Sequence, residues 1–200
     1  ANLDFTAEPG LQALVDVDRI VKSTIVDIDG AQVGLVGLTT DLLPTISSPR
    51  NVTVDSDFLG IAQNEIDMLK NEGVNKIILI THLQSINNET ALAQQLTDVD
   101  VIIAGGGDEL LANNPNVAIP GLAVTGPYPL KVADANGDST LIVTTPGEYR
   151  YVGNLVIEFD GEGKVKNIDE ESDPILVVDY APDPDLQVNV IDSIGIYAES

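Results

Sequence analysis

The sequence predicts an α/β fold with a mixed β-sheet, a βαβ unit at its centre and antiparallel hairpins added to it. Two short, continuous apolar runs, Lys76–Thr81 and Val99–Ala104, are typical of parallel strands that are buried on both faces. A helical segment lies between them. Elsewhere, alternating apolar residues flank an Asp29-Gly30 pair, which is a strong signal for a hairpin turn. Together these observations indicate the α/β class.

The N-terminal part is expected to hold this hairpin, a loop and a helix. The hairpin strands are predicted over Ile20–Ile28 and Gln32–Leu38, and the prolines within Leu42–Asp55 predict a loop. A helix should follow, with Asp55 or Ser56 as its N-cap and Gly73 at its end. Four apolar residues share one face of that helix: Leu59, Ala62, Ile66 and Leu69.

The βαβ unit comes next and is the first place to look for chemistry. Its helix is predicted from Asn88, as N-cap, to Leu96. At their carboxyl ends the two strands lead into polar residues, His82 after the first and Gly105–Glu109 after the second. Open parallel sheets bind ligands at the carboxyl ends of their strands, so we expect these residues to share one site.

After Leu111 the pattern becomes that of loops and hairpins. Ala112–Gly126 is rich in Asn, Pro and Gly and predicts a loop. The extended stretches that follow are Pro129–Ala133, Thr140–Thr145, Tyr151–Phe159 and Val165–Ile168, the last two joined as a hairpin. We divide the chain into a domain over residues 1–168 and an acidic, proline-containing tail over residues 169–200, which leads toward a further domain.

Composition restricts the classes of function. The 32 acidic and 9 basic residues give a net charge of −23, which disfavours binding to nucleic acid polymers and anionic membranes. No apolar run reaches the roughly 20 residues that cross a bilayer. The chain has no cysteine, so disulfides, iron–sulfur clusters and thiol catalysis are excluded. A cation-binding role and a simply solvated acidic surface both remain open.

Three groups of residues are candidate sites, and each has a purely structural alternative. His82, the single histidine, is either a metal ligand or a hydrogen-bonded structural residue. Gly105–Gly107 can form a tight turn, a cation site with the acids that follow, or a nest of backbone N–H groups for an anion. Asp134, Asn136 and Asp138 have the alternate oxygens of a calcium loop, but Asn136-Gly137 is equally a hairpin turn.

Several sequence blocks, taken in order, carry a resemblance to a known family. They are Asn2-Leu-Asp-Phe5, Gly34–Thr40, Ser48-Pro49, Gly73–His82, Val99–Gly106 and Gly147–Leu155, the last of which contains Gly-Glu-Tyr and Val-Gly-Asn-Leu. From about Ala1 to Ile168 the chain resembles the calcineurin-like metallophosphoesterase domain of the 5′-nucleotidase and alkaline-phosphatase-like group. The resemblance implies an α/β/β/α sandwich, of which this chain would be the C-terminal half of the catalytic domain.

The resemblance also implies a set of metal ligands. The family holds two divalent metals (Mn, Zn, Fe or Mg) with five blocks: D-x-H, G-D-x-x-D, G-N-H-E, a lone His, and G-H-x-H or G-H-x-Q. Only the last two have counterparts here. His82 matches the lone histidine, and Gly107 stands where the first ligand of the last block is expected. Glu109 takes the second position, and Asp108 or Glu109 would have to compensate for the missing histidine.

The expected function follows from this resemblance. We expect a fragment of a metal-dependent phosphomonoesterase acting on phosphomonoesters or nucleotides, inactive alone because the upstream ligand blocks are missing. The alternative is a non-catalytic, phosphatase-like module for binding cations such as Ca²⁺, or for display or adhesion. In either case we expect an extracytoplasmic location (periplasmic, secreted or cell-surface), more readily bacterial than eukaryotic. Because removing strands from a shared sheet exposes an unpaired edge, we also expect a dimer or pairing with the missing half.

Overall fold

The structure is a computed structural model that describes residues 1–177, 181, 183–192 and 194. Its centre is a six-stranded mixed sheet in the order β2-β3-β5-β6-β10-β9. These strands are β2 (Ser23–Ile28), β3 (Ala31–Thr39), β5 (Ile77–His82), β6 (Val101–Ile103), β10 (Ser139–Val143) and β9 (Leu130–Ala133). The four inner strands are parallel, and the edge strands β2 and β9 pair antiparallel with their neighbours. The predicted mixed α/β fold is therefore confirmed.

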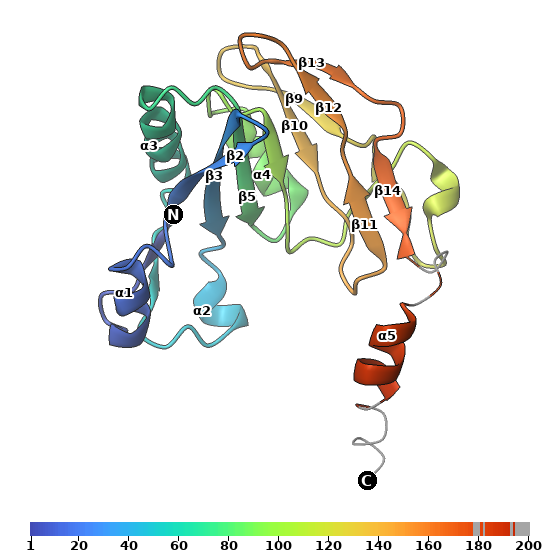
Figure 1. Ribbon diagram of the computed structural model, residues 1–200, viewed down its shortest axis with the longest axis horizontal. Coiled ribbons are helices and arrows are strands. Elements are labelled where there is room, and N and C mark those ends of the chain that lie inside the picture. Colours follow the sequence, from blue (N-terminus) through green and yellow to red (C-terminus); the bar gives the residue numbers. More distant parts are fainter. Residues whose placement is uncertain (178–180, 182, 193, 195–200) are drawn as a thin grey trace.

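Four two-stranded ladders surround this sheet. They pair β1 (Leu3–Asp4) with β4 (Thr53–Val54), β7 (Leu110–Leu111) with β8 (Val124–Gly126), β11 (Tyr151–Asn154) with β14 (Asp173–Leu176), and β12 (Ile157–Phe159) with β13 (Val165–Ile168). In Figure 1 the β11–β14 and β12–β13 ladders lie beyond the β9–β10 side of the sheet. The helical elements are α1 (Pro9–Val15), α2 (Leu43–Ile46), α3 (Phe58–Asn71), α4 (Ile86–Ala93), η1 (Pro115–Val117), α5 (Pro184–Leu186) and the π-helical η3 (Gln187–Ile191).

The first hairpin forms at the predicted turn. Asp29 and Gly30 both have positive φ, 52° and 85°, as a two-residue turn matched to the twist of the strands requires. The carboxylate of Asp27 also accepts a hydrogen bond from the backbone N–H of Gly30 at 3.0 Å. Gly30 lacks the Cβ that makes such a φ costly. The turn places β2 at the edge of the sheet, beside β3.

The helices confirm the predicted order but begin at other residues. Asp57 caps α3, accepting from the N–H of Gly60, so the predicted caps at Asp55 and Ser56 were wrong by one or two residues. Gly73 follows the end of α3 at φ +91°, as predicted. Ser85, rather than Asn88, is the N-cap of α4, because three capping residues follow one another closely and the chain turns at the first of them.

The C-terminal strands differ from the prediction in two places. Tyr151–Phe159 is two strands rather than one, because β11 and β12 pair with different partners on either side of Leu155. The β12–β13 hairpin is confirmed. Strand β14 lies beyond Ile168 and pairs with β11, so regular structure continues into the segment expected to be a tail. The domain division itself stays a prediction, and residues 178–180, 182, 193 and 195–200 of the tail lie outside the described residues.

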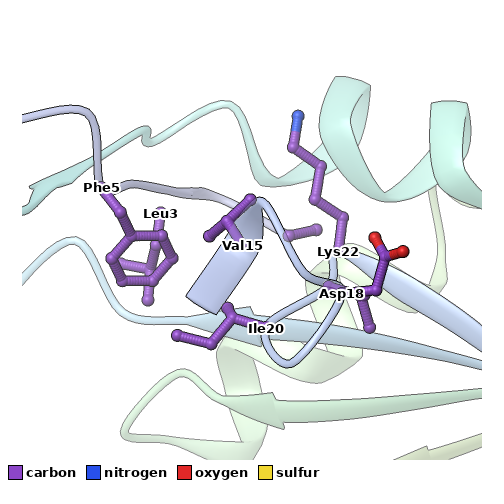
Figure 2. A pocket seen from close by; sticks show the side chains of 8 residues that line it. Leu3, Phe5, Val15, Asp18, Ile20 and Lys22 are labelled. Carbon is purple, nitrogen blue, oxygen red and sulfur yellow. The ribbon is translucent and has the colours of Figure 1, made fainter. Parts of the chain in front are cut away.

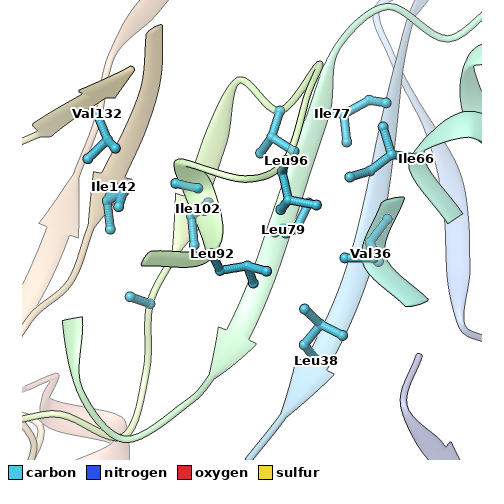
Figure 3. Close-up of a cluster of buried hydrophobic side chains, with 14 of the residues drawn as sticks. Val36, Leu38, Ile66, Ile77, Leu79, Leu92, Leu96, Ile102, Val132 and Ile142 are labelled. Atoms are coloured by element: carbon cyan, nitrogen blue, oxygen red, sulfur yellow. The ribbon is translucent and has the colours of Figure 1, made fainter. Parts of the chain in front are cut away.

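The main core lies between the sheet and the helices α3 and α4. Figure 3 shows its buried side chains, which include Val36, Leu79, Ile102, Ile66 and Leu92. They belong to three strands and both helices. The opposite face of the sheet is covered only in part: side chains around Tyr128 and Leu141 pack beneath β12 and β13. Beyond that patch the parallel strands expose apolar side chains, which is unusual because parallel sheets are normally buried on both faces.

Candidate functional site

His82 ends strand β5, at the carboxyl edge of the sheet. It pairs in register with Thr39 on β3, and its carbonyl accepts a hydrogen bond from the N–H of Thr40 at 3.0 Å. Side chains alternate along a strand, so His82 shares a face with Ile78 and Ile80. That face is the one the helices leave uncovered, and the His82 side chain is exposed there. The predicted position at a strand end is thus what the structure has.

The glycine triplet lies directly against the imidazole ring of His82. A Cβ on Gly105 would stand 3.2 Å from Nδ1 and 3.0 Å from the backbone oxygen of Thr81. A Cβ on Gly106 would stand 2.9 Å from Nε2, and Gly106 also has φ +86°. A side chain at Gly105 would press on its neighbours, and one at Gly106 would both displace them and strain the backbone. The first two glycines therefore seat the ring, whereas a role as an anion nest stays a prediction.

Gly107 and Glu109 form a second close pair. A Cβ on Gly107 would stand only 1.9 Å from Oε2 of Glu109, so the carboxylate occupies the space where a side chain at position 107 would begin. The other oxygen, Oε1, accepts hydrogen bonds from the hydroxyl of Ser85 at 3.3 Å and the N–H of Ile86 at 3.2 Å. These donors begin helix α4, where a negative charge is favourable. Oε2 is buried without a hydrogen-bond partner.

Asp108 lies between these two pairs and is exposed. Its Oδ1 is 3.5 Å from the position of a Cβ on Gly147, so the loop after β10 reaches the same edge as the loop after β6. Two residues of that loop, Glu148 and Tyr149, have positive φ of 69° and 56°. The carboxyl edge thus brings together residues from the loops after β5, β6 and β10.

These side chains do not make a complete metal centre by themselves. Within the described part of the chain, no three or more His, Asp or Glu side chains gather in a way that could hold a metal ion. His82 offers imidazole nitrogens and Glu109 a buried, unpartnered oxygen, which are suitable donors for a divalent metal. Two donors from one chain fall short of the set that such an ion needs. Any catalytic metal pair would need ligands from another segment.

The acidic loop between β9 and β10 is arranged as a turn. Oδ1 of Asp134 accepts hydrogen bonds from the N–H groups of Asn136 and Asp138, both at 2.8 Å. Gly137 has φ +87°, and its N–H donates to the carbonyl of Asp134. The carboxylate of Asp138 instead forms an ion pair with Lys164. One carboxylate oxygen of Asp134 and one of Asp138 are thus engaged within the protein, and calcium binding here stays a prediction.

Glu89 is a residue near the site that sequence reasoning missed. It lies on α4, fully buried, and Oε1 accepts from the hydroxyl of Thr81 at 3.0 Å and from the N–H of Leu83 at 3.2 Å. Burial raises the pKa of Glu89 against the effect of these bonds, and the charge of Glu109 raises it slightly further. An acid in the first turn of a helix is usually solvated, so nothing in the sequence indicates this burial.

Two hollows of the surface lie away from these residues. Figure 2 shows a mostly apolar pocket of about 360 Å³ beside α1, lined by residues that include Leu3, Phe5, Val15 and Ile20. A second cavity, of about 480 Å³, opens on the uncovered face of the sheet between β6 and the β11–β12 segment. Its lining includes Ile103 and Phe159. None of the predicted site residues lines either cavity.

Comparison with known proteins identifies the class first. The fold matches that of a calcineurin-like phosphoesterase of Bacillus subtilis with a TM-score of 0.53, at 20% identity over 88% of this chain and 57% of that one. A 5′-nucleotidase precursor of Thermus thermophilus matches with a TM-score of 0.83, at 30% identity over 100% of this chain and 37% of that one. The chain therefore has the α/β fold of the calcineurin-like metallophosphoesterases.

The particular group follows from the sequence. A 5′-nucleotidase of Diplobatis ommata is 32% identical over 157 residues, which are 78% of this chain and 26% of the relative. The chain thus corresponds to a C-terminal part of a 5′-nucleotidase-like metallophosphoesterase, and it spans about a quarter of the length of that curated relative. No family model matches it. Among the described residues, no helix is long and apolar enough to cross a membrane.

Proposed function

We propose that this chain is part of a metal-dependent phosphomonoesterase that acts on nucleotides and is inactive by itself. The observation that carries the proposal is the placement of His82, which stands exposed on the open face at the carboxyl edge, seated by two glycines. The relatives that support it are named 5′-nucleotidases. When bound in the whole protein, a pair of divalent metals would activate water and neutralise the phosphoryl oxygens.

The exposed apolar face of the sheet supports the proposal that a further layer of structure packs on it in the whole protein. Ile28 on β2, Ile80 on β5 and Ile103 on β6 are 56%, 46% and 44% exposed, although all three belong to the central sheet. Such an apolar face is normally covered. His82 shares that face, so a second layer packed there would bring its own side chains beside the ring. We expect this layer, carrying the D-x-H, G-D-x-x-D and G-N-H-E ligands, to complete the site.

In this arrangement the residues of the present chain have separate roles. His82 would hold metal through one ring nitrogen. Glu109 would contribute the buried Oε2, if a metal can draw it from the space beside Gly107, and Asp108 would reach the site from the exposed loop. Which of Mn, Zn, Fe or Mg is bound depends on ligands that this chain does not contain.

The first experiment compares the chain with a longer protein that also carries the three upstream blocks. Phosphate release from adenosine monophosphate is measured with Mn²⁺, Zn²⁺ or Mg²⁺. The chain alone should release none, the longer protein should be active, and His82→Ala in that protein should lower kcat/KM by at least about 100-fold. Asn87→Ala, an exposed change on α4, is the matched control. Full activity in the His82→Ala protein, or none in the unmodified longer protein, would overturn the proposal.

A second candidate function is a non-catalytic module that binds cations at a cell surface. The specific observations in its favour are Gly107, where a side chain for a catalytic metal is absent and the carboxylate of Glu109 fills the space, and the net charge of −23. Thermal denaturation with Mn²⁺, Zn²⁺, Mg²⁺ and Ca²⁺ separates the two functions. Stabilisation by a transition metal that disappears in His82→Ala favours the phosphatase. Stabilisation by Ca²⁺ alone, unchanged in His82→Ala, favours the module.

We also propose an extracytoplasmic location for the protein and a partner for the uncovered face of the sheet. The Thermus relative is named a precursor, which is consistent with an exported protein and an extracytoplasmic location. The uncovered face would be satisfied either by the remaining half of the domain or by a second copy of this chain. Sedimentation distinguishes them: the chain alone should dimerise at high concentration, whereas the longer protein should not do so through this face.

A further inference from the structure

Glu89 holds both neighbours of His82. Its Oε1 accepts one hydrogen bond from the hydroxyl of Thr81, which precedes the histidine, and one from the N–H of Leu83, which follows it. The donors lie 3.0 and 3.2 Å away, and Glu89 is fully buried. A single buried atom therefore ties the chain on either side of the candidate ligand to helix α4.

The rest of this turn is held by the same helix. The side-chain amide of Asn88 donates to the carbonyl of Leu83 at 2.7 Å, so both backbone groups of Leu83 are engaged by α4 side chains. On the strand side, the carbonyl of His82 is held by the N–H of Thr40. The ring itself has no hydrogen bond in the described part of the structure and rests on the glycines. Its direction is thus set by its backbone and by that contact.

We infer that Glu89 is a positioning residue, which fixes the direction in which the His82 side chain leaves strand β5. The inference rests on the proposed function in one respect, because it gives this direction a purpose only if His82 holds a metal. Residues that orient a metal ligand typically change metal affinity by 10- to 100-fold when they are replaced. Glu89 acts on the backbone around the ligand, so the lower end of that range applies.

Two variants of Glu89 separate positioning from ordinary packing. Glu89→Gln keeps an acceptor oxygen for Thr81 and Leu83, whereas Glu89→Ala removes it. Glu65→Ala is the matched control, because Glu65 is also a buried glutamate on a helix, and it accepts from the hydroxyl of Ser23 at 2.6 Å rather than from the His82 turn. Loss of stability alone should be similar in both alanine variants.

The readouts are local to the turn. His82 is the single histidine of the chain, so the imidazole NMR signals report on it without overlap. Glu89→Ala should shift these signals and speed hydrogen exchange of the Leu83 amide at least tenfold, while Glu89→Gln and Glu65→Ala should leave both near wild type. If Glu89→Ala does not fold, Thr81→Val removes one of the two donors and should shift the same signals. Unchanged signals and exchange in the folded alanine or valine variant would overturn the inference.

Metal binding is measured separately, in the longer protein. Glu89→Ala should weaken Zn²⁺ affinity about tenfold, and Glu89→Gln should restore it to within about twofold of wild type. If the wild-type protein binds no metal at His82, the proposed function fails, but the imidazole signals and the Leu83 amide still decide whether Glu89 positions the ring. If metal binds and both Glu89 variants retain full affinity, the inference fails and the proposed function stands.

Discussion

The two faces of the central sheet differ in how far other elements bury them, although both faces carry apolar side chains. On the helix side, Val36, Leu79 and Ile102 are fully buried beneath α3 and α4. On the other side, Ile80 and Ile103 are close to half exposed. Ile102 and Ile103 are neighbours on the same short strand, so the difference lies in what packs on them and not in their composition.

This difference shows that the apolar content of a strand does not reveal which part of the protein, or which partner, packs on each of its faces. Continuous runs such as those of β5 and β6 indicate burial on both faces, and the chain provides cover for one face together with part of the other. The exposed remainder carries His82 at its edge. The covering layer proposed above would therefore bury these apolar side chains and reach His82 at the same time.

The largest expected effect tests the two faces on one strand. Ile102→Ala removes a fully buried side chain and should lower the free energy of unfolding by about 2–5 kcal/mol. Ile103→Ala, the matched change on the open face, should cost less than about 1 kcal/mol in this chain. Urea unfolding of both variants checks this. Equal losses would mean that the open face is already packed, and the comparison would no longer hold.

A second effect concerns how well the amino end of β6 is shielded from solvent. Asp100 is buried, its carboxylate accepts from the N–H of Ile77 at 2.8 Å, and burial raises its pKa to about 6. A raised carboxyl pKa means that the folded chain holds the proton more tightly than the unfolded chain. The contribution of Asp100 to the free energy of unfolding is therefore largest near pH 4 and below. It decreases as the pH rises toward 6 and is absent above that value.

The matching variant is Asp100→Asn. It should remove up to about 3 kcal/mol of this pH-dependent loss, so unfolding free energies at pH 4 and pH 7.5 should lie closer together than in wild type. Asp67→Asn is a control on an exposed acid of α3, whose charge is not among those that shift the pKa of Asp100. An unchanged difference between the two pH values in Asp100→Asn would show that this end of the sheet is wetter than its burial suggests.

A smaller effect is expected where the two faces meet at the carboxyl edge. Gly106→Ala would put a Cβ at φ +86° and 2.9 Å from Nε2 of His82. We expect a loss of about 1–3 kcal/mol and a displaced imidazole ring. Gly137→Ala has a similar φ of +87° but meets no neighbouring atom, so it carries the backbone cost alone. The excess loss in Gly106→Ala measures the contacts with the Gln84 amide, at 2.8 Å, and the His82 ring together, and a shifted imidazole signal reports the contact with the ring.

The smallest effect on stability comes from Ile80→Asn on the open face. Because Ile80 is already 46% exposed, unfolding should change by less than about 1 kcal/mol. Binding of a fluorescent dye that reports exposed apolar surface should fall clearly. In the longer protein the same change should become costly, since the covering layer would then bury the asparagine. Equal costs in both proteins would argue against a layer at this position.

Much of the fold was predictable because its signals are local. The Asp29-Gly30 turn, the glycine at the end of α3 and the histidine at the end of β5 each depend on a few adjacent residues. The start of α4 was wrong, because Ser85 and Asn88 both suit an N-cap and only the packing of the turn selects between them. Local pattern also joined β11 to β12, which pair with separate strands.

The site was predictable only as far as single positions. His82 and the residues after β6 were found from their places at strand ends. That the carboxylate of Glu109 accepts hydrogen bonds from Ser85 and Ile86 at the start of α4 depends on contacts between residues 23 or more positions apart, which no spacing rule shows. Glu89 gave no signal, since its burial follows from how α4 settles on β5. The sequence therefore predicts which edge of the sheet carries the site, whereas the tertiary contacts determine which side-chain atoms lie there.

The open apolar face also has a colloidal consequence for a chain with a net charge of −23. In dilute buffer, copies repel one another before their apolar strips can meet. Screening shortens this repulsion from about 10 Å at 0.1 M salt to about 3 Å at 1 M, while sulfate and similar salts strengthen apolar attraction. Turbidity of this chain should therefore rise with ionic strength, and the chain would be stored best in dilute buffer, where its own charge keeps the apolar faces of two copies apart.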